Sequence, residues 1–267
     1  MKHTWLWGVL ISATVVVATE LPCEVSWVGN TWGGKPAWVP QDVDDLFVSP
    51  AGDVFTHVGW EEGGGNVTQF DREGTWKGVA RHTHGWGYGG GEAVTANANY
   101  LFIAQRAENE RGKLDDPNTW PPKGFCWWGI SRRLRADCRT GVPFVDGKGG
   151  KGDTLKQRFK VVAELPDGAA ETIRGLCASE HELFVAIKRA GVVRVYDVET
   201  MAELRSWPVS RPDRMVLDAH NTLWVLLAPE KGDGIWSLAG FEMDGREVAR
   251  MAFNAAERPA DLAIDRK

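Results

Sequence analysis

Short apolar segments alternate with polar turns along most of the chain, and no long stretch has the 3.6-residue period of an amphipathic helix. A typical unit begins with an apolar strand and passes through a turn rich in Pro, Gly, Asn, Asp or Ser. It then continues into a second apolar strand that carries an aromatic residue, which is the pattern of a β-hairpin. Four segments follow this pattern, at 44–56, 91–103, 174–185 and 213–225, and a fifth begins at 260–265.

Further apolar strands follow the hairpin in most units. Third strands are predicted at 66–71, 192–197 and 235–238, and outer strands at 203–207 and 248–253. Most units begin about 40–50 residues apart, which is the length of a propeller blade. The sequence therefore predicts an all-β fold, a β-propeller of four-stranded blades. We expect the innermost strands of four blades near Leu46, Val94, Leu176 and Met215.

The second and third units are separated by a much longer interval, which holds a stretch rich in Pro and Gly at 106–156. It is interpreted as an insertion that projects from the disc, because loops of this length in compact domains are usually functional or mobile. The alternative is a further blade within the same interval.

The fifth unit contains its first strand, at 262–265, and lacks the turn and the aromatic strand that the earlier units supply. Closing a six-bladed ring would take on the order of 70–90 further residues. We therefore expect a C-terminally incomplete ring, an open arc with an exposed apolar edge. The alternative is a smaller closed ring in which 262–265 pairs beside a strand at 25–28.

The N-terminus has the pattern of a secretory leader. Lys2 precedes an apolar run from Trp5 to Ala18 that is too short for a transmembrane span and ends in small residues. We expect a signal peptide at 1–18 and a propeller domain at 19–267, hence a secreted or periplasmic protein with no membrane span in the mature chain. A buried strand or a retained anchor is the alternative for the leader.

Composition narrows the possible partners. The formal net charge is −5 and no basic run is present, so nucleic acid is not an expected partner. The 14 Trp residues suit packing between flat sheets or stacking on a sugar. In an oxidising compartment Cys126 and Cys138 are candidates for a disulfide, or else for small buried residues.

One stretch carries a family resemblance. Residues Pro212–Asp218, followed by Leu223-Trp224-Val225, look like the Pro-Asp-Gly-x-x-x-Asp motif and the Leu-Trp-Val strand of the gluconolactonases. As a repeat pattern over about residues 40–267, the chain resembles the NHL-repeat and senescence-marker-protein/gluconolactonase families of six-bladed propellers. The resemblance implies a metal-dependent lactone hydrolase with a divalent cation such as Ca²⁺ in the central channel, held by a Glu, two Asn and an Asp.

The residues two positions before the first apolar anchor of each unit correspond to these metal ligands. They are Asp44, Gly91, Arg174, Asp213 and Ala260. Asp213 matches the family's Asp and Asp44 stands in for its Glu, so these two are the metal candidates. Gly91 offers no side-chain oxygen, and Arg174 would repel a cation. Asp44, Arg174 and Asp213 therefore predict an Arg–carboxylate cluster at the channel mouth, either a site for a polar or anionic ligand or a structural ring of salt bridges.

A second candidate site is the loop that contains His82, His84, Trp86 and Tyr88. Two histidines at i and i+2 of an extended segment face the same way, so they are candidate ligands of a transition metal, with His57 as a third. The loop is also a candidate ligand wall, or a plain connection whose glycines permit positive φ.

Two functions remain open from the sequence. The first is an exported propeller that acts through its loop face as a ligand-binding or scaffold module for a small molecule, a sugar or a protein. The alternative is a metal-dependent lactone hydrolase or a related lyase, with Asp213 in its motif. No G-x-S-x-G elbow, P-loop or H-E-x-x-H motif is present.

Overall fold

The chain forms β-sheets throughout the part that the structure describes. This computed structural model describes residues 43–58, 67–80, 90–108, 123–134, 161–164, 173–232, 234–254, 259 and 261–264. Within these ranges there are β-strands and no helix. Consequently no described segment is a helix long and apolar enough to cross a bilayer.

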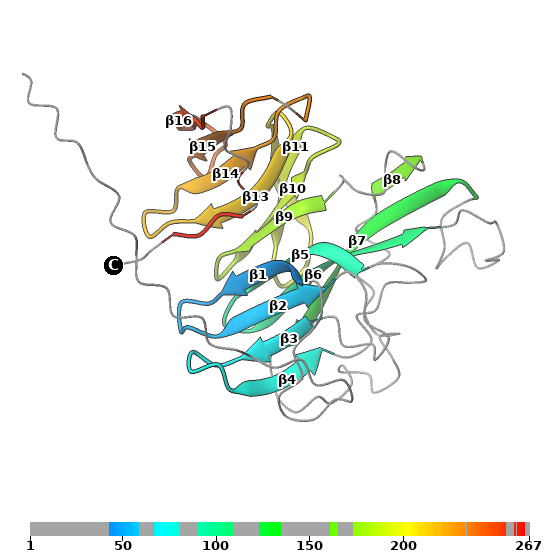
Figure 1. The fold of residues 1–267 in the computed structure, drawn as a ribbon, viewed down its shortest axis with the longest axis vertical. Coiled ribbons are helices and arrows are strands. Elements are labelled where there is room, and N and C mark those ends of the chain that lie inside the picture. Colours follow the sequence, from blue (N-terminus) through cyan, green and yellow to red (C-terminus); the bar gives the residue numbers. More distant parts are fainter. Residues whose placement is uncertain are drawn as a thin grey trace, which may run out of the picture.

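The described strands form four antiparallel sheets, each made of four consecutive strands, and each sheet is a propeller blade (Figure 1). Blade 1 contains β1 (Val43–Val48), β2 (Val54–Val58), β3 (Val67–Phe70) and β4 (Trp76–Ala80). Blade 2 contains β5 (Gly90–Ala96), β6 (Tyr100–Glu108), β7 (Phe125–Leu134) and β8 (Val161–Glu164). Blade 3 contains β9 (Ile173–Ala178), β10 (Glu182–Ile187), β11 (Val192–Asp197) and β12 (Glu203–Pro208). Blade 4 contains β13 (Pro212–Leu217), β14 (Leu223–Leu227), β15 (Ser237–Phe241) and β16 (Glu247–Ala252).

The first strand of each blade is the innermost one. Contacts join β1 to β5, β5 to β9 and β9 to β13, so consecutive blades fan out around a common centre (Figure 1). This confirms the predicted β-propeller with innermost strands near Leu46, Val94, Leu176 and Met215. The described segment 261–264 forms no strand, and in Figure 1 it runs as a red ribbon beside β13. The predicted strand at 25–28 and the leader lie outside the described residues.

The first turn of every blade is closed by a polar side chain that accepts a backbone hydrogen bond. Ser49 accepts from the Asp53 N–H at 3.1 Å, and Asp218 accepts from the Thr222 N–H at 2.8 Å. The same role falls to Asn97 in blade 2 and Ser179 in blade 3. These residues favour turns because their short side chains replace a backbone partner, which explains why the sequence pattern located the hairpins.

Apolar side chains between neighbouring blades form the core. Each interface has its own cluster of fully buried residues, for example Phe55 with Leu101, Trp128 with Leu183, and Phe184 with Val225. Burial of one such large side chain stabilises the fold by about 1.5–3 kcal/mol. Arginine side chains also form hydrogen bonds between blades. Arg132 of blade 2 donates to the Val198 carbonyl at 2.6 Å, and Arg205 of blade 3 donates to the Met243 carbonyl at 2.7 Å.

The structure corrects the expected insertion at 106–156. Its first residues belong to β6, and β7 within it is the third strand of blade 2, paired with β6 from Tyr100 to Glu108. The prediction missed β7 because two of its inward positions, Trp128 and Ile130, are followed by a polar run. The remainder of 106–156 lies outside the described residues.

In blade 4 the third strand is Ser237–Phe241, later than the predicted 235–238.

Substitution of Gly245 tests how closely blade 4 packs against blade 3. It has φ +92°, and a Cβ there would lie 2.6 Å from Trp207 Cγ on β12. Gly74 is a matched control, because it closes a turn with the same backbone hydrogen bonds at φ +81° and a Cβ there would meet nothing within 4 Å.

We expect Gly74→Ala to lower the free energy of unfolding by about 1–2 kcal/mol, the cost of a left-handed alanine. Gly245→Ala should cost about 1–3 kcal/mol more, because Trp207 must also move. Urea unfolding of both variants measures the difference. Equal losses would contradict the close packing of Gly245 on Trp207.

Candidate functional site

All four innermost strands begin with an irregularity in their pairing. The regular ladder is interrupted between Val43 and Asp45 in β1 and between Pro212 and Met215 in β13. In β5 the interruption precedes Val94, and in β9 it falls at Arg174. A bulge leaves residues unpaired and redirects their side chains. Because the innermost strands are equivalent, their bulges lie at the same end of the propeller centre.

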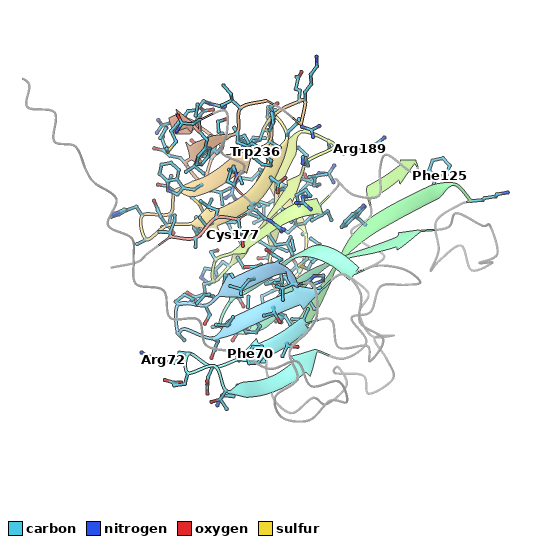
Figure 2. All side chains as sticks on the ribbon, in the orientation of Figure 1. Phe70, Arg72, Phe125, Cys177, Arg189 and Trp236 are labelled. Carbon is cyan, nitrogen blue, oxygen red and sulfur yellow. The ribbon has the colours of Figure 1, made fainter. Side chains whose placement is uncertain are left out.

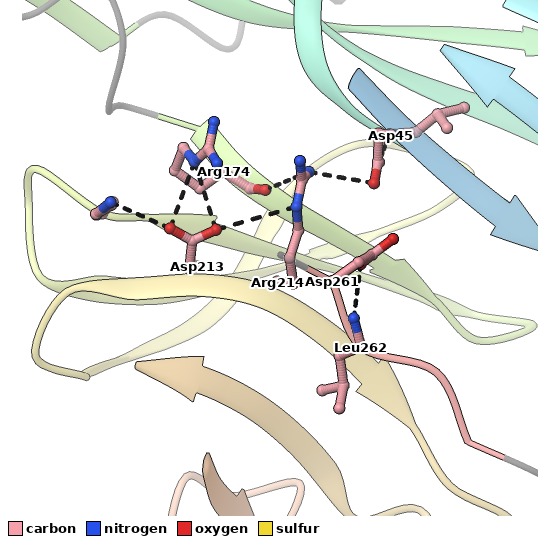
Figure 3. Close-up of polar contacts among 8 residues, drawn as sticks. Asp45, Arg174, Asp213, Arg214, Asp261 and Leu262 are labelled. Atoms are coloured by element: carbon pink, nitrogen blue, oxygen red, sulfur yellow. Dashed lines mark hydrogen bonds and ion pairs between the residues drawn. The ribbon is translucent and has the colours of Figure 1, made fainter. Parts of the chain in front are cut away.

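Asp213 is the focus of the charged side chains at this end. Its carboxylate lies 3.1 Å from Lys188 Nζ and 3.4 Å from Arg174 Nε, and its Oδ1 lies 4.0 Å from Arg214 Nε (Figure 3). The Asp213 and Lys188 side chains are buried, whereas that of Arg174 is 23% exposed. Lys188 Nζ also lies 6.0 Å from the ring centroid of Trp236, the labelled aromatic of blade 4 in Figure 2.

Arg214 connects this group to the other blades. Its Nη1 donates to the Arg174 carbonyl at 2.9 Å and lies 3.2 Å from Asp45 Oδ1 (Figure 3). The other carboxylate oxygen of Asp45 accepts the Val94 N–H at 2.6 Å. We call Asp45, Arg174, Lys188, Asp213 and Arg214 the channel cluster. Through it, polar contacts join blade 1 to blades 2 and 4, and blade 4 to blade 3.

Burial shifts the titration of two groups here in opposite senses. The pKa of Asp45 is raised from 3.8 to about 6, chiefly by burial, although Arg214 and the Val94 N–H lower it. Asp261, in the segment beside β13, adds to the rise. The pKa of His57 is lowered from 6.5 to about 3 by burial and by the positive charge of Arg214. His57 lies directly opposite Asp45 in the β1–β2 pairing.

The structure places the residues predicted from the sequence in three groups. Arg174 and Asp213 lie together and form an ion pair. Asp44 belongs to β1, but its side chain is outside the described part of the chain. His82, His84, Trp86 and Tyr88 also lie outside the described residues, so the loop site stays a prediction.

Asp45, Lys188 and Arg214 were not predicted from the sequence. The repeat pattern indicates one residue per unit at a fixed distance from the apolar anchor, whereas the bulge in β13 brings two neighbours, Asp213 and Arg214, to the centre. Lys188 follows the second strand of its blade, so no count along innermost strands could find it. A signal was present in the sequence: charged residues interrupt or end otherwise apolar strands at all three positions.

The channel cluster does not fit the divalent cation that the family resemblance implies. Three cationic side chains lie within 4.0 Å of the Asp213 carboxylate, and they would repel a metal ion. Nor do three His, Cys, Asp or Glu side chains gather as a metal site among the residues that the structure describes. The metal role expected for Asp213 therefore conflicts with its partners.

The opposite pKa shifts predict opposite effects of pH on stability. Between about pH 4 and pH 6, folded Asp45 holds a proton that the unfolded chain has lost, so its contribution falls as pH rises. Over the same range, folded His57 is neutral while the unfolded chain is protonated, so its contribution rises with pH.

Each group alone changes the unfolding free energy by about 1.4 kcal/mol per pH unit, and together they nearly cancel. Relative to the unsubstituted protein, Asp45→Asn should become more stable as pH rises from about 4 to 6. His57→Leu should become less stable over that range. Urea unfolding across the range measures both slopes, and parallel curves for the three proteins would contradict the assignment.

Comparison with known proteins gives similarities at the level of three-dimensional structure only. No protein-family model and no curated protein matches the sequence. The chain is similar to hydrazine synthase from Kuenenia stuttgartiensis, with a TM-score of 0.45 and 15% identity over 84% of this chain and 53% of that chain. A gluconolactonase from Xanthomonas campestris gives a TM-score of 0.37 and 15% identity over 76% of this chain and 59% of that chain. The extracellular domain of a Bacteroides thetaiotaomicron two-component protein gives a TM-score of 0.35 and 10% identity over 77% of this chain and 21% of that chain. The chain thus spans less than two thirds of each of these proteins, and none of the similarities assigns it a function.

Proposed function

We propose that this chain is an exported β-propeller that binds a small anionic ligand at the channel cluster. The observation that carries the proposal is the convergence of Arg174, Lys188 and Arg214 at one end of the propeller centre. Export rests on the leader-like N-terminus, which the sequence predicts.

The charge of the channel cluster favours an anion. Three cations lie within 4.0 Å of the Asp213 carboxylate, whereas Asp45 pairs with Arg214 and lies near a further carboxylate, Asp261. Among the described residues, positive charge therefore predominates around Asp213. Low-polarity surroundings strengthen attraction for a ligand of opposite charge.

Arg174 supplies the recognition group that a ligand can reach. Its guanidinium is partly exposed, whereas Lys188 and Arg214 are buried beside it. A guanidinium binds a carboxylate or phosphate through parallel N–H···O bonds, and its hydrogen bonds to charged groups are the strong ones. Arg174 thus acts as the primary anchor, and the two buried cations supply the favourable potential.

A metal-dependent lactone hydrolase, the other function left open by the sequence, requires Asp213 as a metal ligand. Lys188 and Arg174 occupy that carboxylate instead, and this is why we place ligand binding first. The wider ligand range considered from the sequence, a sugar or a protein bound through the loop face, remains a separate prediction.

Calorimetric titration tests the proposal, with succinate and phosphate as anionic probes and succinamide as the neutral analogue. We expect the anions to bind and succinamide not to bind. Arg174→Gln and Lys188→Met should each weaken binding by about tenfold to a hundredfold, the effect of losing one charged contact.

Arg250→Gln is the matched control. Arg250 is an exposed arginine paired with Glu247 on the outer strand β16, so its removal should leave affinity unchanged. Equal affinities for all variants, or no binding of any anion, would overturn the proposal. Stoichiometric bound metal together with lactone hydrolysis that Asp213→Ala abolishes would establish the hydrolase instead.

A further inference from the structure

His57 is a fully buried histidine at the channel cluster, and within the described part of the chain neither of its ring nitrogens has a hydrogen-bond partner. It lies near the end of β2, directly opposite Asp45 in the β1–β2 pairing. Side chains of directly opposed residues project from the same face of a sheet. His57 therefore lies beside the carboxylate that holds Arg214 at 3.2 Å.

An unpartnered histidine is costly in such a place. Buried polar groups in folded proteins are nearly always hydrogen-bonded, and a buried group without a partner destabilises the fold. An apolar side chain of similar size would pack among the neighbouring residues without this loss. Such breaches are found at functional sites among other places, and at a site of this kind a ligand can supply the missing partner.

The chemistry of His57 defines the ligand group that fits it. Burial and Arg214 lower the pKa of His57 to about 3, so the ring is neutral at physiological pH. A neutral imidazole offers one N–H donor and one nitrogen acceptor. A hydroxyl group complements it, because a hydroxyl both donates and accepts, whereas a carboxylate only accepts.

We propose that His57 is a specificity-determining residue that hydrogen-bonds a hydroxyl group on the bound anion, so that the ligand is a hydroxycarboxylate. This inference rests on the proposed function: the carboxylate binds the cations of the channel cluster, and the adjacent hydroxyl reaches His57 beside Arg214. Because the His57 ring has no exposed surface, the hydroxyl reaches it only when neighbouring side chains move aside as the ligand enters.

Malate and succinate form a matched pair of probes, because they differ by one hydroxyl. We expect the unsubstituted protein to bind malate about tenfold more tightly than succinate, the size of one hydrogen bond to an otherwise unsatisfied buried group. His57→Leu should lose this preference, with weaker malate binding and unchanged succinate binding. It should also raise the midpoint of urea unfolding near neutral pH, because it removes two unpartnered polar atoms.

Thr68→Val is the matched control. Thr68 is fully buried, and its hydroxyl has no partner among the residues that the structure describes. It is paired with Thr56, the neighbour of His57 that projects from the opposite face of blade 1. Its substitution should leave both affinities unchanged. A second variant, His57→Gln, replaces His57→Leu if the latter does not fold. Its amide also donates and accepts, so it should retain part of the malate preference.

The outcomes separate this inference from the proposed function. If neither anion binds, the proposed function fails. If both bind with equal affinity to the unsubstituted protein, or if His57→Leu weakens both equally, anion binding stands and the role of His57 is overturned. An ordered water on His57, with the malate preference intact in His57→Leu, would overturn it as well.

Discussion

Arg214 is the side chain on which the centre of this propeller depends. Its guanidinium links Asp45 of blade 1, the Arg174 carbonyl of blade 3 and Asp213 of its own blade. The innermost strands start in bulges, where the regular backbone ladder cannot hold them together. Loss of one partner of a buried ion pair costs about 3–5 kcal/mol, because the other charge is left uncompensated. We therefore regard Arg214 as both a structural link and the origin of the site's electrostatics.

The same interaction sets the charge states around it. Asp45 is buried enough that its pKa lies near 6 in spite of its contact with Arg214, and His57 is kept neutral by burial and by that arginine. Asp213 meets three cations rather than a metal ion. Three cations around one carboxylate, beside a neutral imidazole, suit an anion that carries a neutral polar group. It does not suit a hard divalent cation, which prefers oxygen ligands.

Apolar packing and charge have separate places in this fold. Interblade clusters such as that of Phe184 and Val225 hold the blades face to face. At the centre, the backbones of β9 and β13 approach closely beside the channel cluster. A Cβ on Gly175 would lie only 2.2 Å from the Asp213 carbonyl oxygen. This proximity allows Arg174 and Asp213, on neighbouring blades, to share one ion pair.

The sequence by itself determined the blades, because alternation of apolar residues and turn-forming side chains such as Ser49 and Asp218 act over a few neighbouring positions. It also indicated Arg174 and Asp213, which stand two positions before the first apolar anchor of their units. Only the tertiary structure decided that Asp45, Lys188 and Arg214 join them and that His57 lies alongside. Bulges change which residues face the centre, and their position depends on pairing between strands rather than on local sequence. The strand β7 escaped prediction for a related reason: its polar residues become compatible with a strand only when β6 lies beside it.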